Sequence, residues 1–452
     1  MTFDKTAARS EFSRKILLIG IPVVLQNIVS MSLNFMDTLM IGRLGETEVA
    51  AVGAANQVYF VLSVTMFGLL SGSAVFTAQY WGAKDIKGIR RIIGIDLLLG
   101  VAVACLFTAA VMLFPEAILS LFTKDSGVIA CGRDYIRIAC LSYVFTGVST
   151  AFSFNARAIQ RVNAPTAINA AAVLVNIVLN YLLIFGKLGL PALGVKGAAL
   201  ATLIARIAEM AAMLLYVYLA KDHPFRAGRR ELFGFSRSLF LRIMKTAVPV
   251  IVVESSWAVV TALTFGAYGR IGVSAMAVAQ VVSVISELLQ CVFFGVGNAT
   301  AMIIGESLGR GDKDKAYYFG LCAQAATVIL IIVVSLVMLG ISGLVPKLYD
   351  FPPETDQLLV RTLRISALLV TPKMLAYIYM VGILRAGGDN LFCMILEVIC
   401  NLALALPLAF IGVLVLHLSL PAVMALVEIG DVVRILFCVP RFFRRKWINI
   451  VI

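Results

Sequence analysis

A small set of polar side chains lies inside long apolar stretches of this 452-residue chain. Asp37 offers one carboxylate, Asn176 and Asn180 are four residues apart, and Thr202 adds a hydroxyl. Side chains four apart share one face of a helix. Carboxylate, amide and hydroxyl oxygens are ligands that a hard cation such as Na⁺ accepts, and a carboxyl shielded from water could instead carry a proton. The structural alternative is that Asn and Thr only hydrogen-bond neighbouring helices together.

A second set of ionisable residues lies in apolar stretches of the second half of the chain. Its members are Glu254, Glu287, Lys373 and Glu397. Ionisable groups within a membrane are costly and indicate function by default. Three carboxylates and one ammonium suggest a paired network or a cation site, and the alternative is a buried salt bridge between Lys373 and one glutamate. Arg206 and Glu209, three residues apart on one helix face, are expected to pair with each other.

The elements that must position these residues are membrane-spanning helices. The chain is 61% hydrophobic and 14% charged, whereas soluble proteins are about 45–50% apolar and about 25% charged. A spanning helix needs about 20 apolar residues. The sequence therefore predicts an all-α integral membrane protein with about twelve transmembrane helices. The predicted spans are 16–41, 50–75, 90–114, 133–155, 163–186, 195–220, 243–266, 273–304, 317–341, 359–383, 391–414 and 418–440.

The distribution of basic residues predicts the orientation of these spans. With the N-terminus in the cytoplasm, the inside segments carry 26 Lys and Arg, Lys221, Arg157, Arg385 and Arg434 among them, and the outside loops carry six, including Lys124. This bias follows the positive-inside rule and places both termini in the cytoplasm. It also assigns the net charge of +13 to the loops, so no nucleic-acid partner is expected. Another expectation concerns Asp96, Glu428 and Asp431, which should be hydrated near the inner interface.

The two halves of the chain are related by an internal repeat. Pro22 matches Pro249, the segment IGRLG matches YGRIG, and Asp85 matches Asp312, always at an offset of 227 residues. Each copy contains six spans, so the repeat is parallel. The predicted organisation is an N-lobe (1–220), a cytoplasmic linker (221–242) and a C-lobe (243–452). Two such lobes would face each other across a central cleft and could rock between inward-open and outward-open forms.

The sequence contains none of the motifs expected of an ATPase or a common hydrolase. There is no GxxxxGK[ST] phosphate loop, no HExxH and no GxSxG, and the only histidines are His223 and His417. The eight cysteines form no CxxC pair, so neither a zinc site nor a disulfide framework is indicated. We therefore expect neither an enzyme nor a cofactor, and the energy for transport should come from an ion or substrate gradient.

Several stretches resemble one transporter family. They are MDTLMIGRLGE (36–46), AAVGAANQV (50–58), SGSAVFTAQYWGAKD (71–85), NIVLNYLLIFGKLGLPALGVKGAALAT (176–202), PVIVVESSW (249–257), GVGNATAMIIGESLGRGD (295–312), GILRAGGD (382–389) and RFFRRKW (441–447). On these residues the chain resembles the bacterial branch of the multidrug and toxic compound extrusion (MATE) transporters. The resemblance covers almost the whole chain, and the stretch 176–202 is its most specific part.

The resemblance implies two six-helix bundles arranged in a V, with alternating access driven by Na⁺ or H⁺ antiport. It places an N-lobe cation site at the first set of residues, Asp37, Asn176, Asn180 and Thr202, and an acid of span 7 at Glu254. In one respect the chain departs from the family. Some members carry an acidic residue where this sequence has Met374, beside Lys373, which argues against a cation site of that kind in the C-lobe. Lys373 could instead neutralise Glu254 or Glu397.

These observations predict a cation-coupled multidrug efflux antiporter for organic, often cationic or amphipathic compounds. It should be a monomer in the bacterial inner (plasma) membrane, with small organic substrates and the lipid bilayer as its partners. The main alternative is a flippase or exporter of a lipid-linked or amphipathic cell-envelope precursor. A passive channel and a membrane-embedded enzyme are further alternatives, although no catalytic constellation is visible.

Overall fold

The computed structural model is all-helical over the residues that it describes. These are 5–122, 125–220, 223–348 and 351–451, without the side chains of residues 30–36, 38, 39, 42, 46, 229, 273 and 348. Lys124 and Lys221, which entered the charge count, lie outside these ranges. No β-strand occurs in the described ranges, which agrees with the all-α prediction.

The chain forms two compact units that exchange the beginnings of two helices. Residues 25–244 form one unit, here called the N-unit, and residues 1–24 join residues 245–452 in the other, here called the C-unit. Helix α1 (Lys5–Gly42) therefore starts in the C-unit and ends in the N-unit. Helix α10 (Arg237–Gly269) does the opposite, and its first residues, assigned to the linker from the sequence, are helical. Each helix has an internal proline near the exchange, Pro22 in α1 and Pro249 in α10, where a backbone hydrogen bond is missing.

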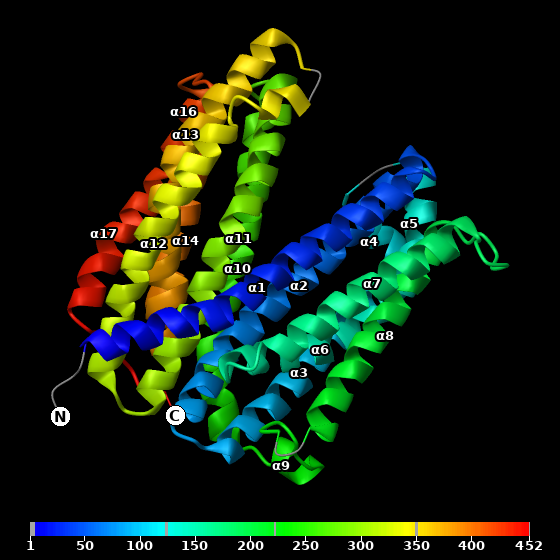
Figure 1. Cartoon of the computed structure of the whole chain (residues 1–452). Coiled ribbons are helices and arrows are strands. Elements are labelled where there is room, and N and C mark those ends of the chain that lie inside the picture. The colour runs from blue at the N-terminus through cyan, green and yellow to red at the C-terminus, as the bar shows by residue number, and fades with distance from the viewer. Residues whose placement is uncertain (1–4, 123–124, 221–222, 349–350, 452) are drawn as a thin grey trace. The chain divides into compact units, whose positions relative to one another are not determined.

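The N-unit is built from long helices that run side by side (Figure 1). After α1 they are α2 (Glu46–Gly82), α3 (Ile86–Leu113), α4 (Pro115–Leu119), α5 (Ser126–Ala139), α6 (Ser142–Ala158), α7 (Asn163–Phe185), α8 (Val195–Leu219) and α9 (Arg229–Phe233). Helices α5 and α6 together form the predicted fourth span, with a bend of 50° between them. Helices α3 and α6 approach closely where Gly100 faces Gly147. A Cβ on Gly147 would lie only 3.1 Å from the carbonyl oxygen of Gly100.

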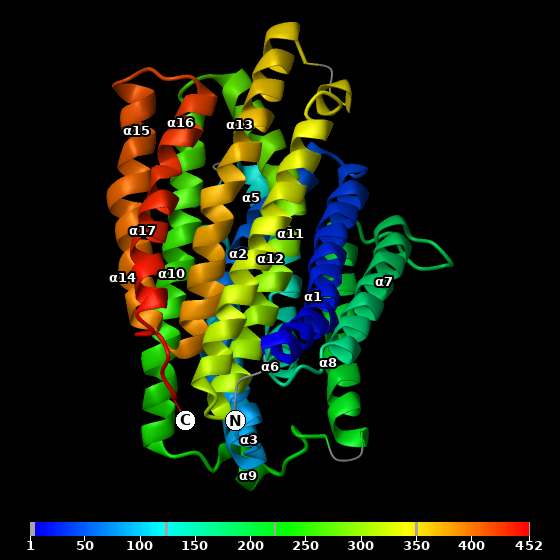
Figure 2. The same cartoon turned by 60° about the vertical axis from the view of Figure 1, so that its left-hand side comes forward.

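The C-unit repeats this arrangement with more interruptions (Figure 2). Its elements after α10 are α11 (Val273–Gly309), α12 (Lys313–Ile341), η1 (Val345–Leu348), α13 (Pro353–Tyr377), η2 (Ile378–Leu384), η3 (Arg385–Gly387), α14 (Asn390–Val398), η4 (Ile399–Ala405), α15 (Leu406–Leu414), α16 (Leu420–Val427) and α17 (Ile429–Phe443). The segments η2 and η4 are π-helical. Such segments insert an extra residue into a helix and often occur at functional sites.

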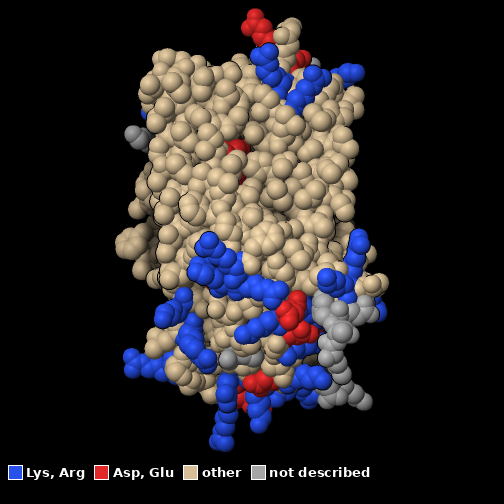
Figure 3. Space-filling model, turned by 90° about the vertical axis from the view of Figure 1, so that its left-hand side faces the viewer, with Lys and Arg blue, Asp and Glu red and all other residues tan. Residues whose placement is uncertain are grey.

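Length and composition make most of these helices able to span a membrane. Within the described residues ten helices qualify, and the bent pair α5–α6 brings the number to eleven. The twelfth predicted span, 418–440, is divided at Glu428 into the short helices α16 and α17. On the face shown in Figure 3, a broad band with hardly any charged residues separates two charged ends, and Lys and Arg gather most densely at one of them. This distribution is typical of a multi-pass membrane protein.

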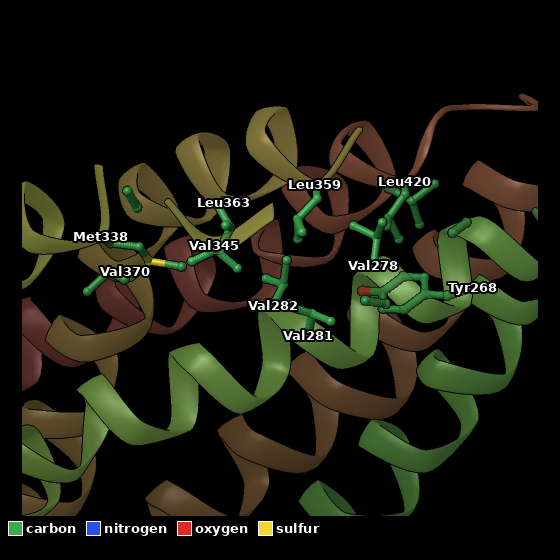
Figure 4. Close-up of a cluster of buried hydrophobic side chains, with 14 of the residues drawn as sticks. Tyr268, Val278, Val281, Val282, Met338, Val345, Leu359, Leu363, Val370 and Leu420 are labelled. Carbon is green, nitrogen blue, oxygen red and sulfur yellow. The ribbon is translucent and has the colours of Figure 1, made fainter. Parts of the chain in front are cut away.

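Buried apolar side chains fill the interior of each unit. In the C-unit, Val278 and Val282 of α11 pack with Leu359 and Leu363 of α13 and with Leu420 of α16 (Figure 4). The N-unit has a corresponding cluster on α2, α3, α5 and α8. Helix packing in lipid relies on such close contacts rather than on the hydrophobic effect, because lipid tails are as apolar as leucine.

The structure also corrects two expectations about charged residues. Asp96 was expected to be hydrated, which is wrong, because its side chain is completely buried between helices. Arg385 and Arg434 were counted in the cytoplasmic segments, but their side chains are only 6% and 11% exposed and form ion pairs with carboxylates of the C-unit. A count along the sequence cannot detect this burial, because Glu254 and Glu397, with which these arginines pair, come from other helices.

Candidate cation-binding site

The N-unit brings Asp37, Asn176, Asn180 and Thr202 together. Asn180 Nδ2 donates to Asp37 Oδ1 at 2.5 Å and lies 2.9 Å from Asn176 Oδ1. Asn176 in turn lies 3.3 Å from Thr202 Oγ1. These side chains come from the end of α1 and from α7 and α8, which pack along their length. The structure therefore brings the four side chains of the first predicted set together in space.

The amide of Asn176 can be turned so that the cluster presents its oxygens differently. In that orientation Asn176 Nδ2 donates to Asp37 Oδ1 at 3.1 Å, and its oxygen accepts from both the hydroxyl and the backbone N–H of Thr202 at 3.3 Å. Asn180 Oδ1 is buried and has no hydrogen-bond partner among the described residues. A buried amide oxygen without a donor is an available ligand. The cluster thus offers one negative charge and several neutral oxygens, a set that suits a monovalent hard cation or a proton.

A small cavity of about 60 Å³, part of it open to the outside, adjoins this cluster. Asp37, Asn176 and Thr202 line it from one side. Three tyrosines also line it: Tyr59, Tyr135 and Tyr143. Aromatic faces attract organic cations and provide apolar contact area. Sequence reasoning did not identify these tyrosines, because nothing in their spacing along α2, α5 and α6 indicates that they converge.

Arg206 lines the same cavity and forms the predicted pair with Glu209. The Nη1 atom of Arg206 donates to Glu209 Oε2 at 2.7 Å, and Asn169 Nδ2 donates to Glu209 Oε1 at 3.0 Å. Both carboxylate oxygens of Glu209 are therefore occupied, while Asp37 has no arginine or lysine within salt-bridge distance among the described residues. Asp37 is consequently the carboxylate of this cavity that is available to a cation.

In the C-unit, Glu254 pairs with an arginine rather than with the expected lysine. Arg385 Nη1 donates to Glu254 Oε1 at 2.9 Å. Arg385 directly follows the π-helical segment η2, which ends at Leu384. The repeat singles out this arginine, since Arg385-Ala386 matches Arg157-Ala158 at an offset of 228, but it does not indicate the carboxylate partner. The matching arginine, Arg157, donates instead to Gln26 Oε1 at 2.6 Å.

Glu397 also pairs with an arginine. Arg434 Nη2 lies 3.3 Å from Glu397 Oε1, which accepts a second bond from Asn401 Nδ2 at 3.0 Å. Arg434 further contacts Asp431 and Asn401. The proposed neutralisation of Glu254 or Glu397 by Lys373 is therefore wrong. Glu254 and Glu397 each pair with an arginine, whose planar guanidinium group can form several hydrogen bonds at once.

Glu287 and Lys373 remain from the predicted set. Lys373 acts on the carboxylates of Glu287 and Glu428 through its charge. Among the described residues, however, no carboxylate oxygen lies within 4.0 Å of its ammonium group. Met374 beside it is buried in the apolar cluster of the C-unit. Of the second set, Glu254 and Glu397 thus pair with different arginines, whereas Glu287 and Lys373 form no ion pair among the described residues.

Comparison with known proteins agrees with this architecture. The sequence profile of the MatE family matches residues 22–182 and 249–411, once in each half of the repeat. The "Probable multidrug resistance protein NorM" of Bradyrhizobium diazoefficiens is 30% identical over 326 residues, which cover 70% of this chain and 67% of the relative. The "Probable multidrug resistance protein NorM" of Thermotoga maritima is 23% identical, with 91% of this chain and 88% of the relative covered.

A solved structure gives the same result for the fold. The crystal structure of a MATE in the bent conformation superimposes with a TM-score of 0.88 at 19% sequence identity, and 98% of each chain is covered. At this identity the likeness concerns the fold alone. The family assignment rests on the two profile matches and on the relative in Bradyrhizobium. This chain is a member of the MatE family of multidrug efflux transporters.

Proposed function

We propose that this chain is a cation-coupled antiporter that exports organic, often cationic or amphipathic compounds by alternating access, with Na⁺ or H⁺ as the coupling ion. The observation that carries the proposal is the Asp37 cluster beside a cavity lined by tyrosines. A carboxylate can hold a metal cation, a proton or an organic cation, but not all at once. Occupation by the coupling ion would therefore oppose occupation by the substrate.

The ligand set supports coupling at Asp37. One carboxylate with Asn176, Asn180 and Thr202 provides one negative charge and at least three neutral oxygens. Divalent ions prefer sites with more carboxylates, and no group of three His, Cys, Asp or Glu side chains suited to a metal occurs in the described part of the chain. The site therefore favours Na⁺ or a proton, and the same oxygens serve either ion.

Transport in proteoliposomes tests this proposal. Vesicles with the wild-type protein, Asp37→Asn or Asp134→Asn would receive an imposed Na⁺ or pH gradient, and ethidium movement would be followed by fluorescence. Asp134 is an exposed acid of α5, paired with Lys196 at 3.1 Å, and serves as the matched control. We expect transport by the wild type and Asp134→Asn under one of the two gradients, and none by Asp37→Asn.

The outcomes separate the alternatives. Gradient-driven transport by Asp37→Asn at the wild-type rate would refute the role of Asp37. Movement of a fluorescent lipid-linked precursor, with no dependence on either gradient and no ethidium transport, would favour a flippase. Size-exclusion profiles and melting curves of the three proteins would show whether a loss of transport reflects a loss of folding.

A further inference from the structure

The N-unit contains a second buried carboxyl that the proposed coupling site does not use. Asp96 is the eleventh residue of α3 and lies toward the end of the unit that carries Lys84, Lys87, Arg90 and Arg91. Its side chain has no exposed surface. An ionised carboxylate transferred out of water loses several kcal/mol of solvation, and proteins offset this loss with a counter-ion or several donors. The contacts of Asp96 therefore indicate its charge state.

Asp96 has no counter-ion within reach. No Lys or Arg within the described residues lies within 4.0 Å of it. Two arginines of α3 and α6 are engaged elsewhere. Arg90 of α3 donates to Glu231 of α9 at 3.0 Å and to Pro224 O at 3.2 Å. Arg157 of α6 donates to Gln26, and its guanidinium lies 5.0 Å from the centre of the Phe154 ring.

Hydrogen-bond donors around Asp96 are also too few for a carboxylate. Asn155 Nδ2 donates to Asp96 Oδ2 at 2.7 Å, and its other hydrogen goes to Ala151 O at 2.9 Å. Thr77 Oγ1 donates to Asn155 Oδ1 at 2.5 Å, which fixes the orientation of this amide. Asp96 Oδ1 has no hydrogen-bond partner in the described structure.

The neighbouring Ser73 hydroxyl is the remaining polar group beside the Asp96 carboxyl. It lies beside the Asp96 carboxyl, but its hydrogen points to Leu70 O at 3.0 Å. In this orientation the serine oxygen can accept a hydrogen bond from a protonated carboxyl, whereas the same hydroxyl turned toward Asp96 would donate to a carboxylate. A protonated carboxyl adds one O–H donor. A proton on Asp96 would thus supply the hydrogen that this arrangement lacks and would remove the uncompensated charge.

The repeat shows that the fold itself does not require this polar cluster. The same positions of the C-unit, at offsets of 227 and 228 residues, are Thr300 for Ser73, Ile304 for Thr77, Ala323 for Asp96 and Ile383 for Asn155. All four are completely buried. Ala323 is likewise the eleventh residue of its helix, α12. The C-unit therefore packs these positions almost without polar groups. Packing alone does not explain why the N-unit has an acid at one of them.

We propose that Asp96 is a proton-binding site at the basic end of the N-unit, separate from the Asp37 cluster, and that it is protonated because it is completely buried without a counter-ion and with one oxygen that has no hydrogen-bond donor. The proton is exchanged when water reaches the inner ends of α2, α3 and α6, because only hydration lowers the free energy of the ionised carboxylate enough for the proton to leave. Its occupant is H⁺ and not a metal ion, since the one amide oxygen of the cluster is already bonded to Thr77.

Infrared spectroscopy of the purified full-length protein tests this assignment directly. A protonated carboxyl in an apolar site gives a C=O stretching band that a carboxylate lacks. We expect this band at neutral pH in the wild type, its loss in Asp96→Asn, and its retention in Asp37→Asn and Asp134→Asn. The measurement needs no gradient and no transport, so it stands whether or not Asp37 couples transport.

Two further arms complete the experiment. If Asp96→Asn does not fold, the triple variant Thr77→Ile, Asp96→Ala, Asn155→Ile, which copies the C-unit, replaces it in the comparison. Spectra are also taken in NaCl and in choline chloride. An unchanged band in both salts supports a proton site. The absence of any Asp96-dependent band, or a band that disappears in NaCl, would overturn the proposal in favour of a carboxylate or a metal-ion site.

Discussion

The Nη1 atom of Arg385 lies 2.9 Å from Oε1 of Glu254, with the arginine side chain 6% exposed and the glutamate side chain 18% exposed. The two residues are 131 positions apart in the chain, on η3 and α10 of the C-unit. This ion pair neutralises the charge of Glu254 without any contribution from Lys373. It also places an arginine at the end of a π-helical segment, where the extra residue rotates the following side chains.

We expect the loss of either member of this pair to destabilise the protein. Glu254→Gln or Arg385→Gln leaves one buried charge without its partner, and breaking a buried pair costs about 3–5 kcal/mol. The double variant removes both charges and should recover most of this free energy of unfolding. Thermal unfolding in detergent would measure the cycle. Additive effects of the two substitutions would show that the residues do not interact.

Gly94 allows the segment between α8 and α10 to dock on α3. A Cβ on Gly94 would lie 1.9 Å from Leu232 O of α9. We expect Gly94→Ala to displace α9, to cost about 1–3 kcal/mol of stability, and to speed cleavage by trypsin after Arg226 and Arg230, whose side chains are already exposed but whose backbone is less firmly held once α9 moves. The matched control is Gly53→Ala in α2, where nothing lies within 4 Å of the added carbon. Equal trypsin resistance of both variants would contradict the role of Gly94.

The repeat supplies a matched pair of helix caps. Asp85 Oδ1 accepts from the Gly88 N–H at 2.9 Å at the start of α3, whereas Asp312 Oδ1 accepts from the Lys315 N–H at 3.4 Å at the start of α12. Removal of an N-cap side chain costs about 1 kcal/mol. Asp85→Ala should cost this amount, and Asp312→Ala less because its bond is longer. Denaturation in mild detergent would rank the two variants, and the reverse order would refute the assignment.

His223, in the segment between α8 and α10, should make stability depend on pH. Burial, and to a lesser extent the nearby Arg161 charge, lower the pKa of its imidazole to about 4. Its Nδ1 atom accepts from the Phe225 N–H at 3.2 Å, a bond that protonation at Nδ1 would abolish. The unfolded chain binds this proton near pH 6.5, so between about pH 6.5 and pH 4 it carries more protons than the folded chain.

The sign follows from this difference in bound protons. The stability that neutral His223 contributes is complete above about pH 6.5 and is lost as the pH falls toward 4. Melting temperatures across this range should therefore decline for the wild type. His223→Gln, which keeps an acceptor but has no titratable group, should show a smaller decline. Parallel curves for the two proteins would exclude His223 as the source.

The sequence alone determined the class of protein, the helical architecture and the composition of the Asp37 cluster. Hydropathy reports spans because the thickness of the bilayer sets the length of an apolar helix, and the constant offset of 227 residues reveals the repeat without any contact information. The members of the Asp37 cluster could be predicted from the sequence for a similar reason. The depth of a residue follows from counting along a span, and Asn176 and Asn180 share a face through the helical period.

Only the tertiary structure decided which charges are paired and which are buried. Whether Glu254 meets Lys373 or Arg385 depends on the rotation of each helix about its axis, and the π-helical segments change that rotation by a residue that hydropathy does not detect. Asp96 looked close to the interface in a count along α3, but α2 and α6 enclose it completely. Burial and pairing are properties of the helices packed around a residue, and a linear sequence does not state which helices those are.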